Sequence, residues 1–138
     1  MITVAIHGTG RMAAAITRVA VKNEEVHIAA LIGPHAPDWS TEVPYFPGLA
    51  QWSGKPDFLI DFSLPAGTET AANWCRENGV PLVSGVTGLS ETATAALQSA
   101  GKRVPVLWSP NLSLGVNLLA DLAGRAGAVL SDSIPVAI

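Results

Sequence analysis

The sequence predicts an α/β protein: a doubly wound parallel sheet covered by helices on both faces, giving three α/β/α layers. Three observations lead to this prediction. Apolar runs of strand length alternate with helix-like runs, a glycine-rich turn joins the first strand to the first helix, and no internal repeat interrupts the alternation. Alternation of this kind produces right-handed crossovers and a parallel sheet. With 138 residues, the chain is long enough for one domain with a proper core.

Composition narrows the classes of partner. Acidic residues outnumber basic ones by 11 to 8, which argues against nucleic acid and against an anionic membrane surface. No apolar run reaches membrane-spanning length and no signal-peptide pattern is present, so we expect a cytoplasmic protein that binds small molecules or protein. Cys75 is the single cysteine, which excludes a disulfide framework, and we expect it to be a small buried helix residue. No metal site is predicted.

Residues 2–6 form the first predicted strand, and the turn after them carries a nucleotide-binding pattern. Gly8-Thr9-Gly10-Arg11-Met12-Ala13 matches G-x-G-x-x-[G/A]. The first glycine makes a tight turn, the second lets the backbone approach a pyrophosphate, and the small third residue lets helix and strand pack closely. The helix that follows, to about residue 22, points its N–H groups and dipole at a diphosphate. We therefore predict dinucleotide binding here, the alternative being a merely tight turn.

The second predicted strand, Val26–Ile32, completes a strand-helix-strand unit but is not followed by the usual carboxylate. Dinucleotide folds place an acidic residue at the end of this strand to hold the adenosine ribose, whereas residues 33–35 carry none and the first is Asp38. His35 lies near a 2′-phosphate or is a solvated loop residue, and we favour the second. His7, just before the first glycine, faces phosphate or fills space under the loop, and we favour packing.

The rest of the chain alternates strand and helix after one long loop. Residues 33–56 carry five prolines and little periodicity, which predicts a loop with one short strand around residues 43–46. Beyond it, Ser63 is a candidate helix cap with Pro65 in the first turn. The further predicted strands are 58–61, 81–84, 104–108 and 134–138, and the further predicted helices are 65–78, 91–101 with Ser90 as its cap, and an amphipathic one at 114–129.

In a doubly wound sheet, ligands bind in the crevice beyond the carboxyl ends of the strands. The loops that meet there are 8–12, 61–64, 85–88 and 109–113, each rich in glycine or hydroxyl groups. Asp61 is a general-base candidate, but a strand-end aspartate that caps the following turn is the favoured interpretation. Trp74 and Trp108 are expected in the core or on a surface that another domain covers.

Four motifs follow one another along the chain: G-T-G-R-M, D-F-S-L-P, V-S-G-V-T-G and S-P-N-L-S-L-G-V-N. In order and spacing they resemble the nucleotide-binding half of the dihydrodipicolinate reductases (4-hydroxy-tetrahydrodipicolinate reductases). The resemblance implies a Rossmann-like NAD(P)-binding domain over residues 1–130 and, at 131–138, the start of a substrate domain that is otherwise absent. It also implies an oxidoreductase in which NADPH or NADH delivers a hydride to a cyclic dicarboxylate of lysine and diaminopimelate biosynthesis.

Carried over position by position, the resemblance implies a cofactor site on four loops. The residues expected to hold the pyrophosphate are Gly8, Thr9, Gly10, Arg11 and Met12. Phe62 and Ser63 would pack along the cofactor. The nicotinamide would be lined by Gly85, Val86 and Thr87, and by Ser109, Pro110, Asn111 and Leu112.

The chain departs from the family pattern at several points. The glycine loop is one residue shorter and ends on Ala13, Val86 stands where the family usually has threonine, and Leu112 where it usually has phenylalanine. The carboxylate after the second strand is missing, which leaves the preference between NADH and NADPH open. Nothing there repels a 2′-phosphate, and Arg11 with His35 would attract one.

The largest departure is that the family's catalytic H-H-x-x-K segment and its P-S-G-T substrate loop are absent. All three histidines precede the middle of the chain, and the cations after Gly88, which are Lys102, Arg103 and Arg125, are expected to be solvated surface charges. We therefore assign no catalytic residue and expect the chain alone to be inactive. A substrate domain, a partner chain or a homo-oligomer would have to supply the dicarboxylate site. The alternatives are a non-catalytic NAD(P)H-binding or regulatory module and a different dehydrogenase.

Overall fold

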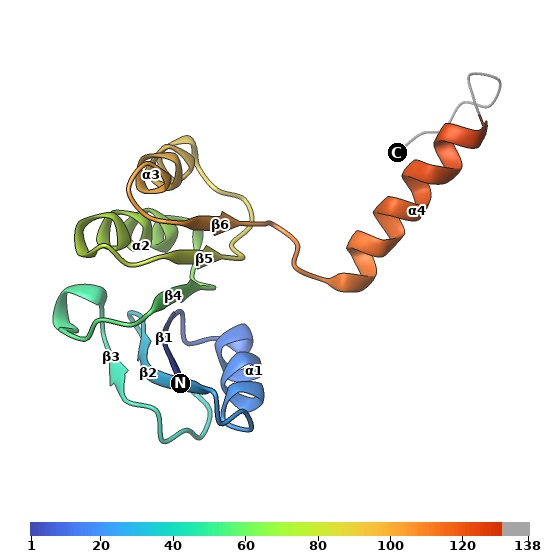
Figure 1. Ribbon diagram of the computed structural model, residues 1–138. Coiled ribbons are helices and arrows are strands. Elements are labelled where there is room, and N and C mark those ends of the chain that lie inside the picture. The colour runs from blue at the N-terminus through green and yellow to red at the C-terminus, as the bar shows by residue number, and fades with distance from the viewer. Residues whose placement is uncertain (131–138) are drawn as a thin grey trace.

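The computed structural model describes residues 1–130, and its strands form one parallel sheet. The strand order is β3-β2-β1-β4-β5-β6, and each neighbouring pair is parallel (Figure 1). The predicted doubly wound sheet is therefore confirmed, with the order reversing between β1 and β4. The strands are β1 Ile2–His7, β2 Val26–Ile32, β3 Tyr45–Phe46, β4 Phe58–Asp61, β5 Leu82–Ser84 and β6 Val106–Trp108.

Helices cover both faces of the sheet, as predicted. The helices are α1 Arg11–Ala20, α2 Pro65–Asn78, α3 Glu91–Gly101 and α4 Leu114–Leu130, with a 3-10 helix, η1, at Leu49–Gln51. Side chains alternate across a strand, so Val4 packs on the α1 face and Ala5 on the α2 and α3 face. None of the helices in this part of the chain has the length and apolarity needed to span a bilayer.

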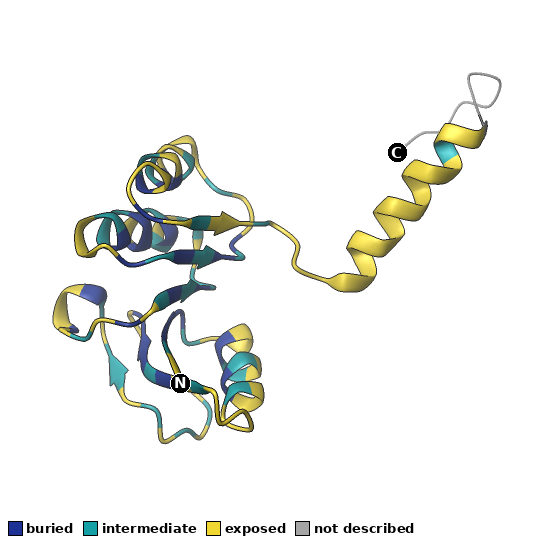
Figure 2. Cartoon of the chain, viewed as in Figure 1, coloured by how far each residue is buried: buried dark blue, intermediate teal, exposed yellow. Residues whose placement is uncertain are grey.

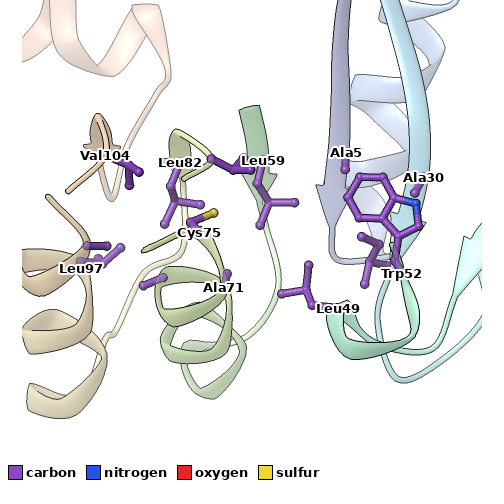
Figure 3. Packing of buried hydrophobic residues seen from close by; sticks show 14 residues of the cluster. Ala5, Ala30, Leu49, Trp52, Leu59, Ala71, Cys75, Leu82, Leu97 and Val104 are labelled. Atoms are coloured by element: carbon purple, nitrogen blue, oxygen red, sulfur yellow. The ribbon is translucent and has the colours of Figure 1, made fainter. Parts of the chain in front are cut away.

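The larger core cluster lies between the sheet and the pair α2 and α3 (Figure 3). Leu59 and Leu82 of the strands meet Ala71 and Cys75 of α2 and Leu97 of α3, all almost fully buried. The predicted burial of Cys75 is confirmed, and this burial, with a smaller contribution from the charge of Asp61, raises the pKa of the thiol to about 12. Cys75 is therefore an inert core residue rather than a nucleophile.

The long loop between β2 and β4 contains the predicted short strand, reduced to β3, and it contributes to the core through η1 and Trp52. The Trp52 ring stacks on that of Trp74 with 5.9 Å between centroids. Trp74 therefore packs against the core, which is one of the two placements expected for it. The connection from β3 to β4 holds only the short η1, and Leu49 and Trp52 of this connection bury their side chains in the core.

Two helix caps predicted from serines behave differently. Ser90 caps α3 as predicted, because its Oγ accepts a hydrogen bond from the Ala93 N–H at 3.1 Å. The cap role of Ser63 is wrong: the N-cap of α2 is Leu64, with no side-chain cap bond, and the Ser63 hydroxyl donates to Asp61 instead. The strong carboxylate acceptor competes successfully with the helix terminus for this hydroxyl.

The predicted amphipathic helix is present as α4, but it extends away from the sheet (Figures 1 and 2). Leu114 is 85% exposed and Leu119 66% exposed, and Leu118 and Leu122 are exposed as well. Periodicity predicts that a helix has an apolar face but does not say which element covers that face. The predicted strand at 134–138 and the predicted domain start at 131–138 lie outside the described residues.

Candidate functional site

The two glycines of the first loop have different structural roles. Gly8 has φ of +117°, a conformation that side chains disfavour, and a Cβ there would lie 2.6 Å from the Phe62 carbonyl oxygen. Gly10 is exposed, and a Cβ there would meet no atom within 4 Å. The fold therefore requires glycine at position 8, whereas position 10 leaves space in front of the helix.

The N-terminus of α1 behind Gly10 is open to an anion. Gly10 provides no side-chain cap, and the first turn carries no acidic residue. The first intrahelical bond runs from the Ala14 N–H to the Gly10 carbonyl at 3.0 Å, so the three preceding N–H groups have no partner within the helix. Unpartnered N–H groups and the positive end of the helix dipole fit a diphosphate, and the Arg11 side chain is exposed beside them.

Residues of the long loop bind the glycine loop through what we term the β2-side network: Thr9, Gly33, His35, Trp39 and Tyr45. The Thr9 hydroxyl donates to the His35 carbonyl at 2.9 Å, and the Trp39 indole donates to the Thr9 carbonyl at 2.9 Å. The Tyr45 hydroxyl donates to the Gly33 carbonyl at 2.9 Å. The backbone after β2 is therefore fixed against the glycine loop without a carboxylate, and the His35 side chain is exposed, as favoured.

A second set, the β4-side network, gathers His7, Asp61, Ser63, Thr68 and Ser84 around one carboxylate. Asp61 is fully buried and accepts five hydrogen bonds. Oδ1 accepts from His7 Nδ1 at 3.0 Å and from the Ser63 N–H and hydroxyl at 3.2 and 2.6 Å. Oδ2 accepts from the hydroxyls of Thr68 at 2.7 Å and Ser84 at 3.0 Å. Asp61 thus caps the turn after β4, as favoured.

Electrostatics keep this carboxylate ionised. Burial by itself raises the pKa of Asp61, but the hydrogen bonds from His7, Ser63 and Thr68 and the charge of His7 outweigh it and lower the pKa below 3.8. His7 is buried and packs under the loop, the placement favoured from the sequence. A carboxylate that is fully hydrogen-bonded and sealed from solvent organises its neighbours and is not available as a general base.

Phe62 connects three of the loops. Its carbonyl oxygen lies against Gly8, and a Cβ on Gly85 would overlap the Phe62 ring. Backbone bonds run alongside, from the Phe62 N–H to the His7 carbonyl at 2.9 Å and from the Gly85 N–H to the Asp61 carbonyl at 3.0 Å. Phe62 and Ser63 therefore lie between the glycine loop and the loop after β5.

The loop after β5 is joined to the end of β6. The Val86 carbonyl accepts from the Trp108 indole at 2.9 Å, and the Ser109 N–H donates to the Ser84 carbonyl at 3.1 Å. Thr87 is exposed at the rim. Trp108 is 42% exposed, so it belongs to the surface rather than the core. Residues 84–87 and 108–109 are thus joined at the carboxyl edge of the sheet, on the far side of Phe62 from the glycine loop.

Comparison with known protein families shows to which family this chain belongs. The family described as dihydrodipicolinate reductase, N-terminus, matches residues 2–112. The chain belongs to this family. The 4-hydroxy-tetrahydrodipicolinate reductases of Xylella fastidiosa (strain 9a5c) and Stenotrophomonas maltophilia (strain K279a) are 41% and 42% identical to it over 91% of this chain. The match covers 55% of each relative, so the chain spans about half the length of these curated relatives.

Solved structures agree with the fold of a dihydrodipicolinate reductase N-terminus. The dipicolinate-bound dihydrodipicolinate reductase from Paenisporosarcina sp. TG-14 superimposes with a TM-score of 0.75 at 27% identity, over 91% of this chain and 53% of that one. The myo-inositol 2-dehydrogenase from Lactobacillus plantarum shares the fold, with a TM-score of 0.72 at 11% identity over 91% of this chain and 41% of its own. The predicted cofactor class, NADPH or NADH, is confirmed for the family, and the open α1 terminus fits it.

The residues predicted from dihydrodipicolinate reductases do not all lie equally close to the crevice. The loops holding Gly8, Phe62, Gly85 and Ser109 meet at the carboxyl edge of the sheet. Pro110, Asn111 and Leu112 are exposed, and the hydrogen bonds of Asn111 run to Ser109, Ser113 and Asn117. These three residues therefore belong to the turn that leads into α4.

The cations considered for the dicarboxylate lie elsewhere, as predicted. Lys102 and Arg103 are exposed at the end of α3, on the amino side of β6. Arg125 is exposed on α4 and pairs with Asp121 at 3.0 Å. Within residues 1–130, no three histidine, cysteine or acidic side chains gather in a way that could hold a metal ion.

Sequence reasoning missed two contributors to this candidate site. The Trp39 indole bond to the glycine loop comes from a segment without periodicity, so no pattern pointed to it. The full Asp61 network was also missed, because it joins residues up to 54 positions apart. One local signal existed: a serine two positions and a threonine seven positions after Asp61 place hydroxyls where the turn and the first helical turn return to the strand end.

Proposed function

We propose that residues 1–130 form the NAD(P)H-binding domain of a dihydrodipicolinate reductase. The observation that carries the proposal is the uncapped N-terminus of α1 behind the open Gly10, at the point where the strand order reverses. Gly8 to Met12 would hold the diphosphate through backbone N–H groups. Phe62, Ser63, Gly85 to Thr87 and Ser109 would orient the nicotinamide and exclude water from one of its faces, and Pro110 to Leu112 would adjoin it from the turn that leads into α4.

The bound cofactor would supply a hydride for reduction of 4-hydroxy-tetrahydrodipicolinate in lysine and diaminopimelate biosynthesis, a reaction of the cytoplasm. The substrate is a dianion, and its reduction needs cations to hold two carboxylates and an acid to complete the proton transfer. In the described residues, Lys102, Arg103 and Arg125 lie away from the crevice. We therefore propose that a further domain, a partner chain or another copy of this chain supplies the dicarboxylate site. We also propose that these 138 residues alone do not reduce the substrate.

A thermal shift measurement with Gly10→Val tests the cofactor site. Ligand at about 100 times its dissociation constant stabilises a fold by roughly 2.7 kcal/mol, which is several degrees for a domain of this size. Because a Cβ at position 10 would meet no protein atom within 4 Å, Gly10→Val is expected to abolish the shift by blocking the diphosphate while leaving the fold intact. Gly124→Val, also in open space but on α4, is the control and keeps the shift.

The same titrations compare the two cofactors. Arg11 and His35 are exposed near a strand end without a carboxylate, so NADPH is expected to bind at least as well as NADH. An unchanged melting temperature with either cofactor at millimolar concentration, or a full shift in Gly10→Val, contradicts the proposed site. Tighter NADH binding that Arg11→Ala does not alter contradicts only the preference.

A second candidate, an NAD(P)H-binding module without chemistry, is favoured by the position of the cations away from the crevice. Activity in trans separates the two. NADPH absorbance is followed with fresh substrate, with this chain alone and with the C-terminal half of a related reductase added. The enzyme proposal expects no turnover alone and turnover with the added half. Binding of NADPH without turnover in either mixture favours the module.

A further inference from the structure

Two of the hydrogen-bond networks at the carboxyl edge of the sheet share no residue. The β2-side network (Thr9, Gly33, His35, Trp39 and Tyr45) joins the glycine loop to the backbone after β2. The β4-side network (His7, Asp61, Ser63, Thr68 and Ser84) joins the ends of β1, β4 and β5 to α2. The β2-side network therefore supports the side of the glycine loop that faces β2, whereas the β4-side network supports the loops after β4 and β5 and reaches the glycine loop only through His7.

This division matches the two halves of a dinucleotide. In a doubly wound sheet, the diphosphate sits at the first strand-helix turn and the adenosine ribose at the end of the second strand. The β2-side network lies at that adenosine end. The other nucleotide must then lie over β4, β5 and β6, where the β4-side network supports the loops from below.

Resting on the proposed cofactor site, we propose that Asp61 is a positioning residue for the nicotinamide half of the cofactor and has no part in holding the adenosine half. Asp61 is fully buried and its two oxygens already accept five hydrogen bonds, so it acts through its partners. Ser63 lies in the loop between β4 and α2, and Ser84 is the last residue of β5, directly before Gly85. Through these two serines Asp61 is bonded to both loops expected to line the nicotinamide.

The positioning role requires a carboxylate at position 61, because every hydrogen bond there is donated to Asp61. An ionised carboxylate only accepts, so the Ser84 hydroxyl must donate to Asp61 and keeps its lone pairs for the Val86 N–H, 3.4 Å away. The Ser63 hydroxyl is likewise held as a donor to Oδ1. An asparagine amide presents N–H groups on one side, so either the Oδ1 set or the Oδ2 set loses its acceptor and the loop above it is released.

Two ligands that differ only in the nicotinamide ring test the proposal: NADPH and 2′-phospho-ADP-ribose. Binding of each to the 138-residue chain is measured by calorimetry at a temperature where circular dichroism shows every variant folded. Asp61→Asn is expected to weaken NADPH about tenfold, the scale of one or two lost polar contacts, and the fragment by less than about twofold. Trp39→Phe removes the indole donor of the β2-side network and is expected to weaken both ligands by the same factor.

Asp57→Asn is the matched control. Asp57 also bonds β4 to β1, through Oδ2 to the Thr3 N–H at 2.7 Å, but it is exposed at the opposite edge of the sheet, so neither affinity is expected to change. Ser84→Ala serves if Asp61→Asn does not fold, and it is expected to weaken NADPH selectively through Val86. Equal weakening of both ligands by Asp61→Asn or Ser84→Ala overturns this inference alone. Failure of the unchanged chain to bind NADPH overturns the proposed function and this inference with it.

Discussion

The two ends of the β1–β4 strand pair carry the same residue type in opposite environments. Asp57, just before β4, is exposed and accepts one hydrogen bond, from the Thr3 N–H. Asp61, the last residue of β4, is fully buried and accepts five. The carboxyl edge of a parallel sheet is where strands turn into helices and backbone groups lose their partners, so polar side chains concentrate there. At the amino edge, by contrast, the exposed Asp57 needs only one protein hydrogen bond because water solvates the rest of its carboxylate.

The left-handed glycines show the same contrast. Gly79 ends α2 at the amino edge with φ of +68°, and a Cβ there would meet nothing within 4 Å. Gly8 at the carboxyl edge combines a positive φ with contact against the Phe62 carbonyl. Gly79 at the amino edge is needed only for its positive φ. Gly8 at the carboxyl edge is needed for its positive φ and also because a Cβ there would collide with Phe62. Substitutions at matched positions on the two edges therefore compare how much the contacts at each edge contribute to the free energy of unfolding.

The largest expected difference is between Asp61→Ala and Asp57→Ala. Removing the buried carboxylate leaves a histidine and three hydroxyls without their acceptor, and such losses cost about 3–5 kcal/mol. Removing the exposed one costs about 1 kcal/mol or less. Urea denaturation followed by circular dichroism gives both free energies of unfolding. Equal losses at the two positions would show that the edges do not differ in the way described.

A smaller difference is expected between Gly8→Ala and Gly79→Ala. Alanine at position 79 pays only the left-handed backbone penalty, about 1 kcal/mol. Alanine at position 8 adds the contact with the Phe62 oxygen, and we expect about 3 kcal/mol in total. Melting temperatures of the two variants, measured side by side without ligand, check the order. A Gly8→Ala variant as stable as Gly79→Ala would mean that the Phe62 backbone moves aside freely.

The smallest effect concerns acid. Because the pKa of Asp61 is lower in the folded chain than its ordinary value of 3.8, its ionised form contributes stability that is present above that value. This contribution is lost as pH falls through the lowered folded-state pKa, with a slope of at most about 1.4 kcal/mol per pH unit for one group. Asp61→Asn is expected to flatten the decline of unfolding free energy below pH 4, and Asp57→Asn to leave it. A decline of the same slope in Asp61→Asn would assign the acid sensitivity to other groups.

Much of the fold follows from local patterns in the sequence. The strands around Ala5, Ile28 and Leu59 are apolar runs, the Ser90 cap and the Gly79 terminus are local features, and the structure has each of them. The Ser63 cap failed because a carboxylate two residues earlier takes its hydroxyl. The position of α4 could not be predicted, since an apolar helix face does not identify what covers it.

The candidate site divides in the same way. The glycine loop can be predicted from the spacing of its glycines. The open N-terminus of α1 also follows from the local sequence, because Gly10 at the cap position has no side chain to cap it. The supports of the crevice are not local: Trp39 reaches Thr9 from a loop without pattern, and Asp61 gathers donors from four segments of the chain. Such contacts depend on how the strands align, which only the folded sheet decides.

The position of Phe62 between Gly8 and Gly85 limits which residues the fold tolerates at these three positions. A Cβ at Gly8 would meet the Phe62 backbone, which every residue at position 62 would present, whereas the three nearest atoms to a Cβ at Gly85 all belong to the Phe62 ring. The cost of replacing Gly8 therefore does not depend on the side chain at position 62, whereas the cost of replacing Gly85 is expected to fall when position 62 is not aromatic. In a library randomised at the three positions and selected for stability, larger residues at 85 would be recovered together with smaller ones at 62, while glycine would be preferred at position 8 whatever stands at 62.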